Sequence, residues 1–231
     1  MLNVLLECVK IAYSLIEFVL KYISSPTLMI KSLFVDDRRV HSRLPRHLAV
    51  LYTEKTAISL DTLCELLVEC AFAGIKQVSI YDPWSCVHLH RKQIMCQTAV
   101  IMNAKGRRSM PSLRFSTPGE TAEDLEKASS ALIVNLLGKD AGKRAIVKLC
   151  ANGDPSSINA QNITASLALE TISEPELLLK VGQVESMCGY PPWSLRVTEI
   201  LPLRRLDGHL SRQHLISFLD QFNRRERRFG R

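Results

Sequence analysis

HLAVLY, residues 47–52, is an apolar run of the length of one β-strand. A strand that is apolar at successive positions, rather than at alternate ones, is typical of the centre of a parallel sheet, which is covered on both faces. Similar runs recur along the chain, and stretches with helical periodicity separate them. Strands that alternate with helices predict an α/β fold with a parallel central sheet flanked by helices.

The other elements of this fold are predicted from the same two patterns. The stretch after the first strand has leucines at helical spacing and ends at Gly74, a residue type that commonly ends helices. The further predicted strands are 77–82, 113–116, 131–137, 177–181 and 194–200, and the predicted helices are 58–74, 85–103, 117–129, 141–150, 158–169 and 211 to about 228.

The charge of the chain points to an anionic partner. Its net charge is +7, and residues 204–231 hold eight arginines against three acidic residues. Aromatic residues make up only 6% of the chain and do not alternate with the basic ones, as they do in single-stranded nucleic-acid platforms. Nucleic acid is therefore not an expected partner. The seven cysteines include no Cys-x-x-Cys pair, so they indicate neither a zinc knuckle nor a disulfide framework.

Residues 2–23 are almost wholly apolar, and their polar members lie on one narrow stripe of a helix. Such a helix is either lodged in lipid or buried in a core. Its two charged residues near the centre would each cost on the order of 3 kcal/mol inside a bilayer, a cost that a helix lying in the interface avoids. We expect a hydrophobic membrane-anchoring helix at 1–25, which spans the membrane or lies on it, a linker at 26–42, and a globular domain at 43–231. Basic residues after the helix predict that this domain is cytosolic.

Two stretches that resemble functional motifs do not meet the requirements of those motifs. GKDAGKR, residues 138–144, is one residue too short for a phosphate-binding P-loop and has Arg144 where a magnesium-binding Ser or Thr is needed. His88 and His90 have neither acidic nor sulfur neighbours and are expected at the surface or in a groove. No Gly-x-Gly-x-x-Gly follows a predicted strand, so a dinucleotide site is not expected.

The chain ends on the basic sequence RRERRFGR, residues 224–231. An arginine fork beside a glycine, whose backbone N–H can approach a ligand closely, is the pair of donors that a pyrophosphate requires. A solvated basic tail is the alternative reading. The tail by itself favours a solvated basic tail. Other features of the sequence are needed to choose between this reading and a pyrophosphate-binding segment.

Three internal stretches resemble the cis-prenyltransferases. Residues 43–51, RLPRHLAVL, resemble the first strand of that family, and residues 174–180, EPELLLK, resemble its Pro-Asp-Leu-Leu-Ile-Arg segment. Residues 189–200, GYPPWSLRVTEI, with the Arg-Phe-Gly near the end, are closer still to one branch of the family. That branch is the Nogo-B receptor type, the non-catalytic subunit of eukaryotic dehydrodolichyl diphosphate synthase. The resemblance covers about residues 43–231 and implies the fold of the family.

The sequence departs from the catalytic members of that family where they bind pyrophosphate. Thr53 stands at the position of their catalytic aspartate and cannot supply the negative charge that Mg²⁺ prefers, and their next residue, a glycine, is Glu54. Lys180, Gly182 and Ser186 stand where the catalytic pattern has Arg, Ser and Arg. Two guanidinium forks are thus replaced by a point charge and a hydroxyl. We expect no catalytic residue in this chain and no activity of the chain alone.

The resemblance instead gives the chain a role beside a catalytic partner subunit. It implies that Arg228 and the Gly230 amide bind the pyrophosphate of isopentenyl diphosphate in the partner's active site, with Arg227 or Arg231 as auxiliary donors. The partner would hold the Mg²⁺, and the complex, at the endoplasmic reticulum membrane, would make the dolichol precursor used in protein glycosylation. The interface candidates are Pro192, Trp193, Arg196 and Glu199, for which ordinary packing of an apolar edge is the alternative.

A function of another class fits the same sequence. The chain could be a membrane-tethered adaptor or receptor that binds protein or lipid ligands through a vestigial prenyltransferase domain. The tail distinguishes the two functions, because an adaptor has no need of Arg-Phe-Gly at its end whereas the enzyme subunit does.

Overall fold

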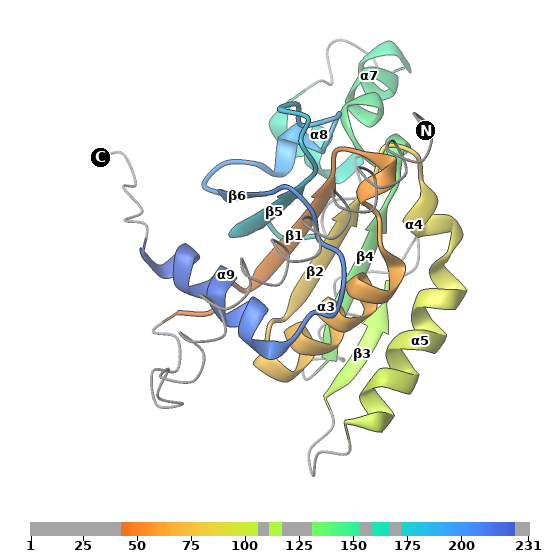
Figure 1. Cartoon of the computed structure of the whole chain (residues 1–231). Helices are drawn as coiled ribbons and strands as arrows, with labels where there is room; N and C mark the ends of the chain where they lie inside the picture. Colours follow the sequence, from red (N-terminus) through yellow and green to blue (C-terminus); the bar gives the residue numbers. More distant parts are fainter. Residues whose placement is uncertain (1–42, 106–110, 117–130, 153–158, 167–171, 225–231) are drawn as a thin grey trace, which may run out of the picture. The chain divides into compact units, whose positions relative to one another are not determined.

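The computed structural model describes residues 43–105, 111–116, 131–152, 159–166 and 172–224, and Figure 1 shows their arrangement. The chain divides into two compact units, Met1–Ser42 and Arg43–Arg231, and every described residue belongs to the second. The predicted anchoring helix and linker therefore lie outside the described residues. Within the described part of the chain, no helix is both long and apolar enough to cross a membrane.

Within these residues, six parallel strands form one sheet in the order β3-β4-β2-β1-β5-β6, which confirms the predicted parallel central sheet. β1 lies at its centre, and all of its residues are buried, as the run HLAVLY predicts. The strands are β1 (His47–Tyr52), β2 (Gln77–Tyr81), β3 (Ser112–Phe115), β4 (Ala131–Leu137), β5 (Leu177–Val181) and β6 (Glu199–Leu203).

Helices flank this sheet. The first of them begins after Ser59, whose side chain accepts a hydrogen bond from the Thr62 amide, and ends at Gly74, where φ is +90°. The helices are α3 (Leu60–Ala73), α4 (Cys86–Leu89), α5 (Arg91–Ala104), α7 (Lys143–Asn152), α8 (Ala160–Ser166) and α9 (Arg212–Arg224), and the 3₁₀ turns are η1 (Lys55–Ala57), η2 (Lys139–Ala141) and η5 (Pro192–Ser194).

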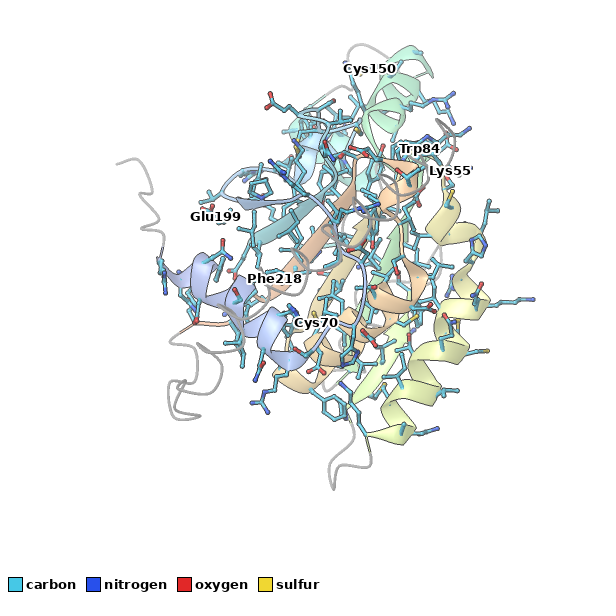
Figure 2. The ribbon with its side chains drawn as sticks, in the orientation of Figure 1. Lys55, Cys70, Trp84, Cys150, Glu199 and Phe218 are labelled. Atoms are coloured by element: carbon cyan, nitrogen blue, oxygen red, sulfur yellow. The ribbon has the colours of Figure 1, made fainter. Side chains whose placement is uncertain are left out.

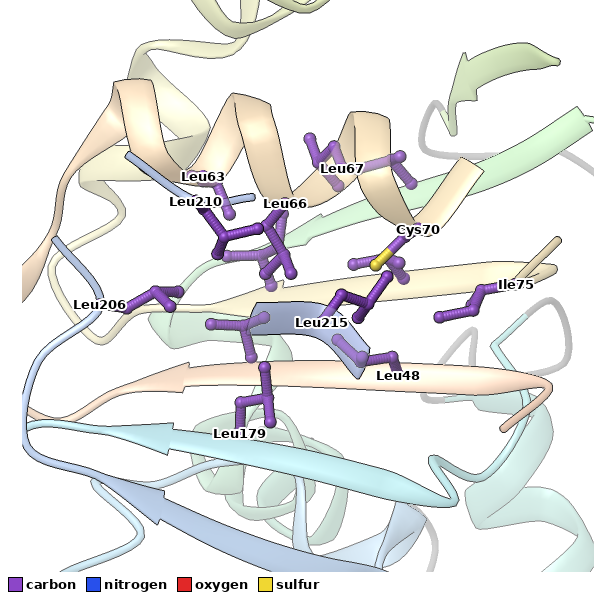
Figure 3. Packing of buried hydrophobic residues seen from close by; sticks show 14 of the residues in the cluster. Leu48, Leu63, Leu66, Leu67, Cys70, Ile75, Leu179, Leu206, Leu210 and Leu215 are labelled. Atoms are coloured by element: carbon purple, nitrogen blue, oxygen red, sulfur yellow. The ribbon is translucent and has the colours of Figure 1, made fainter. Parts of the chain in front are cut away.

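The larger hydrophobic core lies between one face of the sheet and the helices α3 and α9. Figure 3 shows Leu48 and Leu179 from the sheet beside Leu66 and Leu67 from α3 and Leu215 from α9. Full burial of one such side chain contributes roughly 1.5–3 kcal/mol. A smaller cluster on the opposite face consists of Ala49, Leu51, Tyr81, Leu178 and Tyr190.

The order of the strands changes direction between β1 and β5, a point where open parallel sheets have a crevice; we use the word crevice for the residues at this point, Thr53, Glu54 and 181–183. After β1 the chain builds β2, β3 and β4 on one side, and only then crosses to β5 and β6 on the other side. The chain therefore continues from β1 toward one side of the sheet and from β5 toward the other. In open parallel sheets this is the position where ligands bind.

The prediction of a strand at 194–200 is wrong. Pro192, Trp193 and Ser194 form a 3₁₀ turn, and the strand β6 starts only at Glu199, opposite Leu177 of β5. Two consecutive prolines with fixed φ favour a turn over a ladder at this point. The strand then continues through Pro202, which is possible because β6 is an edge strand, where one missing N–H need not break the ladder.

The other differences concern the helices. The predicted helix 85–103 is divided at His90 into α4 and α5, because His90 leaves the helical backbone region and its Nδ1 lies 2.7 Å from the Cys86 carbonyl oxygen. The predicted helix 117–129 and the end of the predicted helix 211–228 lie outside the described residues. Hydrophobic periodicity does not register a one-residue break, since the apolar stripe continues across it.

A buried histidine begins β1. The His47 side chain is 1% exposed, and its Nδ1 donates to the Ser173 carbonyl at 2.6 Å, so its Nε2 accepts from the Ser79 hydroxyl at 2.8 Å. Burial lowers the pKa of His47 from 6.5 to about 4, although the hydrogen bond to Ser173 opposes this shift. The folded domain therefore holds a neutral imidazole at pH values where the unfolded chain is protonated.

This buried imidazole predicts acid sensitivity. Between pH 6.5 and about 4 the unfolded state binds a proton that the folded state does not, so the free energy of unfolding falls as the pH falls, by up to about 3 kcal/mol from this group. Urea denaturation at pH 7 and pH 4.5 measures this loss, and His47→Gln should reduce it. His88→Gln removes an exposed histidine and should not. An equal pH dependence in the wild type and in His47→Gln contradicts the assignment.

Candidate functional site

The crevice between the carboxyl ends of β1 and β5 is the candidate site, and Thr53 lies in it. Thr53 is 3% exposed. Its backbone N–H donates to the Val181 carbonyl at 2.8 Å, and its hydroxyl donates to the same oxygen at 3.1 Å. The hydroxyl proton is thus used within the chain, and the side chain presents no charge. Thr53, which the resemblance aligns with the catalytic aspartate, thus connects the end of β1 to the end of β5.

Gly182 closes the same crevice from the side of β5. Its φ is +121°, a backbone conformation that favours glycine, and a Cβ atom there would lie 2.2 Å from the Thr53 Oγ1. Its N–H donates to the Leu203 carbonyl of β6 at 2.9 Å. Thr53 and Gly182 are therefore in contact, with no room for a side chain between them.

Glu54 binds the backbone N–H of the residue that follows Gly182. Its Oε1 accepts a hydrogen bond from the Gln183 N–H at 2.6 Å. A backbone N–H at the carboxyl edge of a parallel sheet is a group that can bind a phosphate oxygen. Here a carboxylate of the same chain binds it, which also places a negative charge where an anionic ligand would approach. The arrangement disfavours a pyrophosphate at this position.

Two loops meet over the crevice and close it further. The Lys143 N–H, after β4, donates to the Gly189 carbonyl at 3.0 Å, and a Cβ atom on Gly142 would lie 2.0 Å from that oxygen. The Tyr81 hydroxyl donates to the Cys188 carbonyl at 3.1 Å, and its ring packs edge-on against Tyr190 at 5.5 Å. The segment GKDAGKR, rejected as a P-loop from its spacing, thus contributes a closely packed turn.

Asp82 is a functional-looking residue that the sequence pattern did not single out. It follows β2, is fully buried, and accepts hydrogen bonds from the N–H groups of Trp84, Cys86 and Val87 at 3.0, 2.9 and 2.9 Å. Both carboxylate oxygens are used to cap the turn into α4. Asp-Pro directly after an apolar run is the sequence signal for such a cap. Figure 2 shows Trp84 and Lys55 at the same end of the sheet, the end where the strands β2 and β1 finish.

The remaining positions of the catalytic pattern do not form an anion site either. Lys180 is half-buried in β5, opposite Leu51 and Pro202. Ser186 is exposed and its Oγ accepts from the Cys188 N–H at 3.1 Å, within its own turn. The structure thus brings Thr53 and Gly182 together, while Ser186 serves a local turn.

The residues of the crevice do not fit a divalent cation. Mg²⁺ prefers anionic oxygen ligands, whereas Thr53 is neutral and Glu54 is committed to the Gln183 amide. Among the described residues there is also no group of three or more His, Cys, Asp or Glu side chains close enough together to hold a metal ion.

The four interface candidates lie on and just before β6. Pro192 and Arg196 are exposed, whereas Trp193 and Glu199 are half-buried. The Arg196 Nε lies 3.1 Å from the Glu174 Oε1 in an exposed ion pair. Glu199, labelled in Figure 2, begins the edge strand. Arg227, Arg228, Gly230 and Arg231 lie outside the described residues, which end at Arg224 of α9.

Comparison with known proteins agrees with this fold. The profile of the undecaprenyl diphosphate synthase family of prenyltransferases matches residues 84–230. The chain is 25% identical over 209 residues to the dehydrodolichyl diphosphate synthase complex subunit NUS1 of Homo sapiens, covering 84% of this chain and 70% of that protein. It is also 25% identical over 185 residues to the nus1 subunit of Schizosaccharomyces pombe, covering 71% of this chain and 69% of that one.

A solved structure has a similar fold. The crystal structure of a probable undecaprenyl diphosphate synthase from Campylobacter jejuni is similar with a TM-score of 0.52 and 20% sequence identity, over 81% of this chain and 100% of that chain. At this identity the similarity concerns the fold alone.

The contact between Thr53 and Gly182 makes a testable prediction. Gly182→Ala should lower the free energy of unfolding by about 3 kcal/mol, because it adds a steric clash to an unfavourable φ. Gly74→Ala is the matched control, since Gly74 also has positive φ but has nothing within 4 Å of a Cβ atom, and should lose only about 1 kcal/mol. Urea denaturation measures both. Thr53→Ala removes the clashing Oγ1 and should partly rescue Gly182→Ala; independent, additive losses would contradict the contact.

Proposed function

The chain belongs to the undecaprenyl diphosphate synthase family of prenyltransferases, and on this basis we propose that it is the non-catalytic subunit of a heteromeric cis-prenyltransferase of the dehydrodolichyl diphosphate synthase type. The two relatives at 25% identity are both named as subunits of that synthase complex, which supports this assignment. The complex would extend a farnesyl diphosphate with isopentenyl units to make the dolichol precursor for protein glycosylation.

The observation that carries the proposal is that the residues at the carboxyl ends of β1 and β5 are paired with one another. The Thr53 hydroxyl donates to Val181, the Glu54 carboxylate binds the Gln183 amide, and Gly182 lies against Thr53. A prenyl diphosphate arriving at this edge would meet a carboxylate and a neutral hydroxyl instead of a metal and free N–H groups. Binding there would require breaking hydrogen bonds that the fold already makes, each worth about 1 kcal/mol.

In this proposal the partner subunit performs the chemistry. Its aspartate would hold the Mg²⁺, which would supply positive charge to the departing allylic pyrophosphate. The double bond of isopentenyl diphosphate would form the new bond to the allylic carbon, and the adduct would lose a proton to give the product. The present chain contributes donors, a binding surface for the partner and attachment to the membrane. Its own crevice takes no part in the reaction.

The donors that we assign to this chain are Arg228 and the Gly230 N–H, with Arg227 or Arg231 as auxiliary groups. A guanidinium binds two pyrophosphate oxygens at once, and a glycine amide can approach a third without steric hindrance. The last described helix, α9, leads the chain from the core to Arg224, from which the terminal segment continues. The donors would reach the isopentenyl diphosphate in the partner's active site.

The surface that we assign to the partner includes Pro192, Trp193, Arg196 and Glu199. They lie around β6, an edge strand of the sheet, where Val197 and Ile200 are 46% and 37% exposed. Edge strands with exposed apolar residues are usually covered. A partner chain at this edge would bury them. We further propose that residues 2–23 attach the complex to the endoplasmic reticulum membrane, with the domain on the cytosolic side.

The tail hypothesis is tested in the heteromer. Deletion of residues 228–231 should lower turnover about 100-fold, as the loss of transition-state and substrate donors does in other enzymes, and Gly230→Ala should lower it as well. Arg204→Ala, which removes an exposed arginine from the same basic region, should not. Co-purification checks that the heteromer still assembles; unchanged turnover of the truncated heteromer would favour the adaptor function instead.

The expected lack of catalytic activity is tested with the purified chain alone. Purified protein with Mg²⁺, farnesyl diphosphate and isopentenyl diphosphate should form no product, because neither Thr53 nor Glu54 can take the role of the metal-binding aspartate. Addition of a catalytic subunit should restore turnover. Product formed by the chain alone would overturn the proposal.

A further inference from the structure

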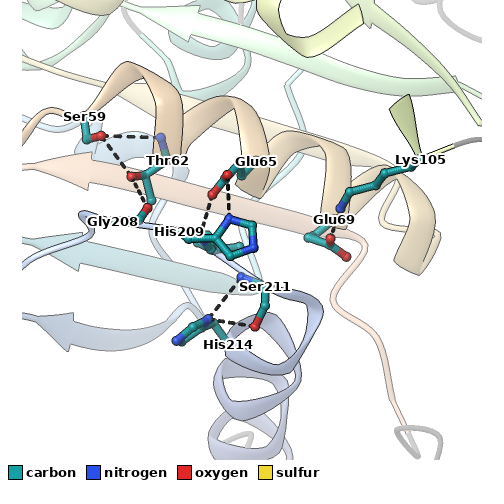
Figure 4. A network of polar contacts seen from close by, with 10 residues as sticks. Ser59, Thr62, Glu65, Glu69, Lys105, Gly208, His209, Ser211 and His214 are labelled. Atoms are coloured by element: carbon teal, nitrogen blue, oxygen red, sulfur yellow. Dashed lines mark hydrogen bonds and ion pairs between the residues drawn. The ribbon is translucent and has the colours of Figure 1, made fainter. Parts of the chain in front are cut away.

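The segment between β6 and α9 is fastened to α3 by polar contacts that the proposed function does not use. The Thr62 hydroxyl donates to the Gly208 carbonyl at 2.7 Å. One turn further along α3, Glu65 binds two consecutive residues: its Oε1 lies 2.8 Å from the His209 Nδ1, and its Oε2 accepts the Leu210 N–H. Figure 4 shows these contacts side by side. We call this group of residues, 62, 65 and 208–210, the α3 clamp.

The α3 clamp holds the chain directly before α9 begins. Leu210 is buried, and Ser211, the residue before α9, binds the His214 Nδ1 through both its N–H and its hydroxyl at 3.1 and 3.0 Å. The backbone turns at Gly208, where φ is +79°. The position at which the helix starts is therefore fixed by a carboxylate on a different helix, 145 residues away in sequence from Leu210.

α9 leads from this position to Arg224, the last described residue. Its Leu215, Leu219 and Phe222 are buried in the core that also contains the leucines of α3. A helix advances about 1.5 Å and turns about 100° for each residue, so a slip of one residue at its start would move and rotate everything that follows. The four residues 228–231 follow α9 closely in sequence.

From this arrangement we infer that Glu65 is a positioning residue for the terminal donors, an inference that rests on the proposed role of Arg228 and Gly230. Glu65 touches no substrate. It holds the residues directly before α9, the helix from which the terminal segment continues. A misplacement of about 1 Å of a binding group is enough to reduce catalysis many-fold.

Two variants and one control separate positioning from a general loss of structure. Glu65→Ala removes both contacts of the carboxylate. Glu65→Gln keeps an acceptor for the Leu210 N–H and is the conservative variant. Glu69→Ala is the matched control, because Glu69 lies one turn along the same helix and is paired with Lys105, away from the segment before α9.

The experiment measures KM for isopentenyl diphosphate and kcat in the heteromer with a catalytic subunit. Each variant is made in the full-length chain and in the chain lacking residues 228–231. In the full-length chain, Glu65→Ala should raise KM about tenfold, while Glu65→Gln and Glu69→Ala should leave it close to the wild-type value. In the truncated chain, Glu65→Ala should have no further effect, because the donors that it positions are absent. Thermal unfolding of each variant checks that the domain is folded.

Three results would overturn the inference. An equal rise in KM in both backgrounds would mean that Glu65 acts through the fold or through assembly. A rise in KM in Glu69→Ala as large as that in Glu65→Ala would mean the same for α3 as a whole. A truncation that leaves turnover unchanged would instead overturn the proposed function, and the inference with it.

Discussion

The pairing of β1 with β5 holds the sheet in one piece. β2, β4 and β3 follow each other on one side of β1, and β5 and β6 lie on the other, so among the described strands this is the pairing that joins the two groups. It continues beyond the strands, because Thr53 makes two hydrogen bonds to Val181 and Glu54 binds the Gln183 amide. The candidate site is therefore part of the joint on which the fold depends.

This placement means that the carboxyl edge of the sheet is stable without a ligand. Buried polar groups must be paired, and in a ligand site some of that pairing waits for the ligand. Here the chain supplies the partners itself: the Thr53 hydroxyl has a carbonyl, the Gln183 amide has a carboxylate, and Asp82 has three amides. Such internal pairing stabilises the carboxyl edge of the sheet in the absence of any ligand.

The central strands could be predicted from the sequence because burial on both faces leaves largely apolar runs, as at 47–52, 131–137 and 177–181. The boundaries of β6 could not, because they depend on pairing with β5 and on the tolerance of an edge strand for Pro202. The same holds for the crevice. The sequence shows directly that position 53 carries no charge. The contact of Glu54 with Gln183, however, joins residues 129 positions apart, so no local sequence pattern predicts it.

The packing of Thr53 on Gly182 also limits which residues these two positions tolerate. A carboxylate at position 53 would direct an oxygen at the Val181 carbonyl, acceptor against acceptor, in a position that is 3% exposed to water. A serine at position 182 would meet the Thr53 side chain at 2.2 Å. Each of these changes is unfavourable in the present packing. The contact therefore disfavours both a charge at position 53 and a side chain at position 182 when either is introduced by a single substitution.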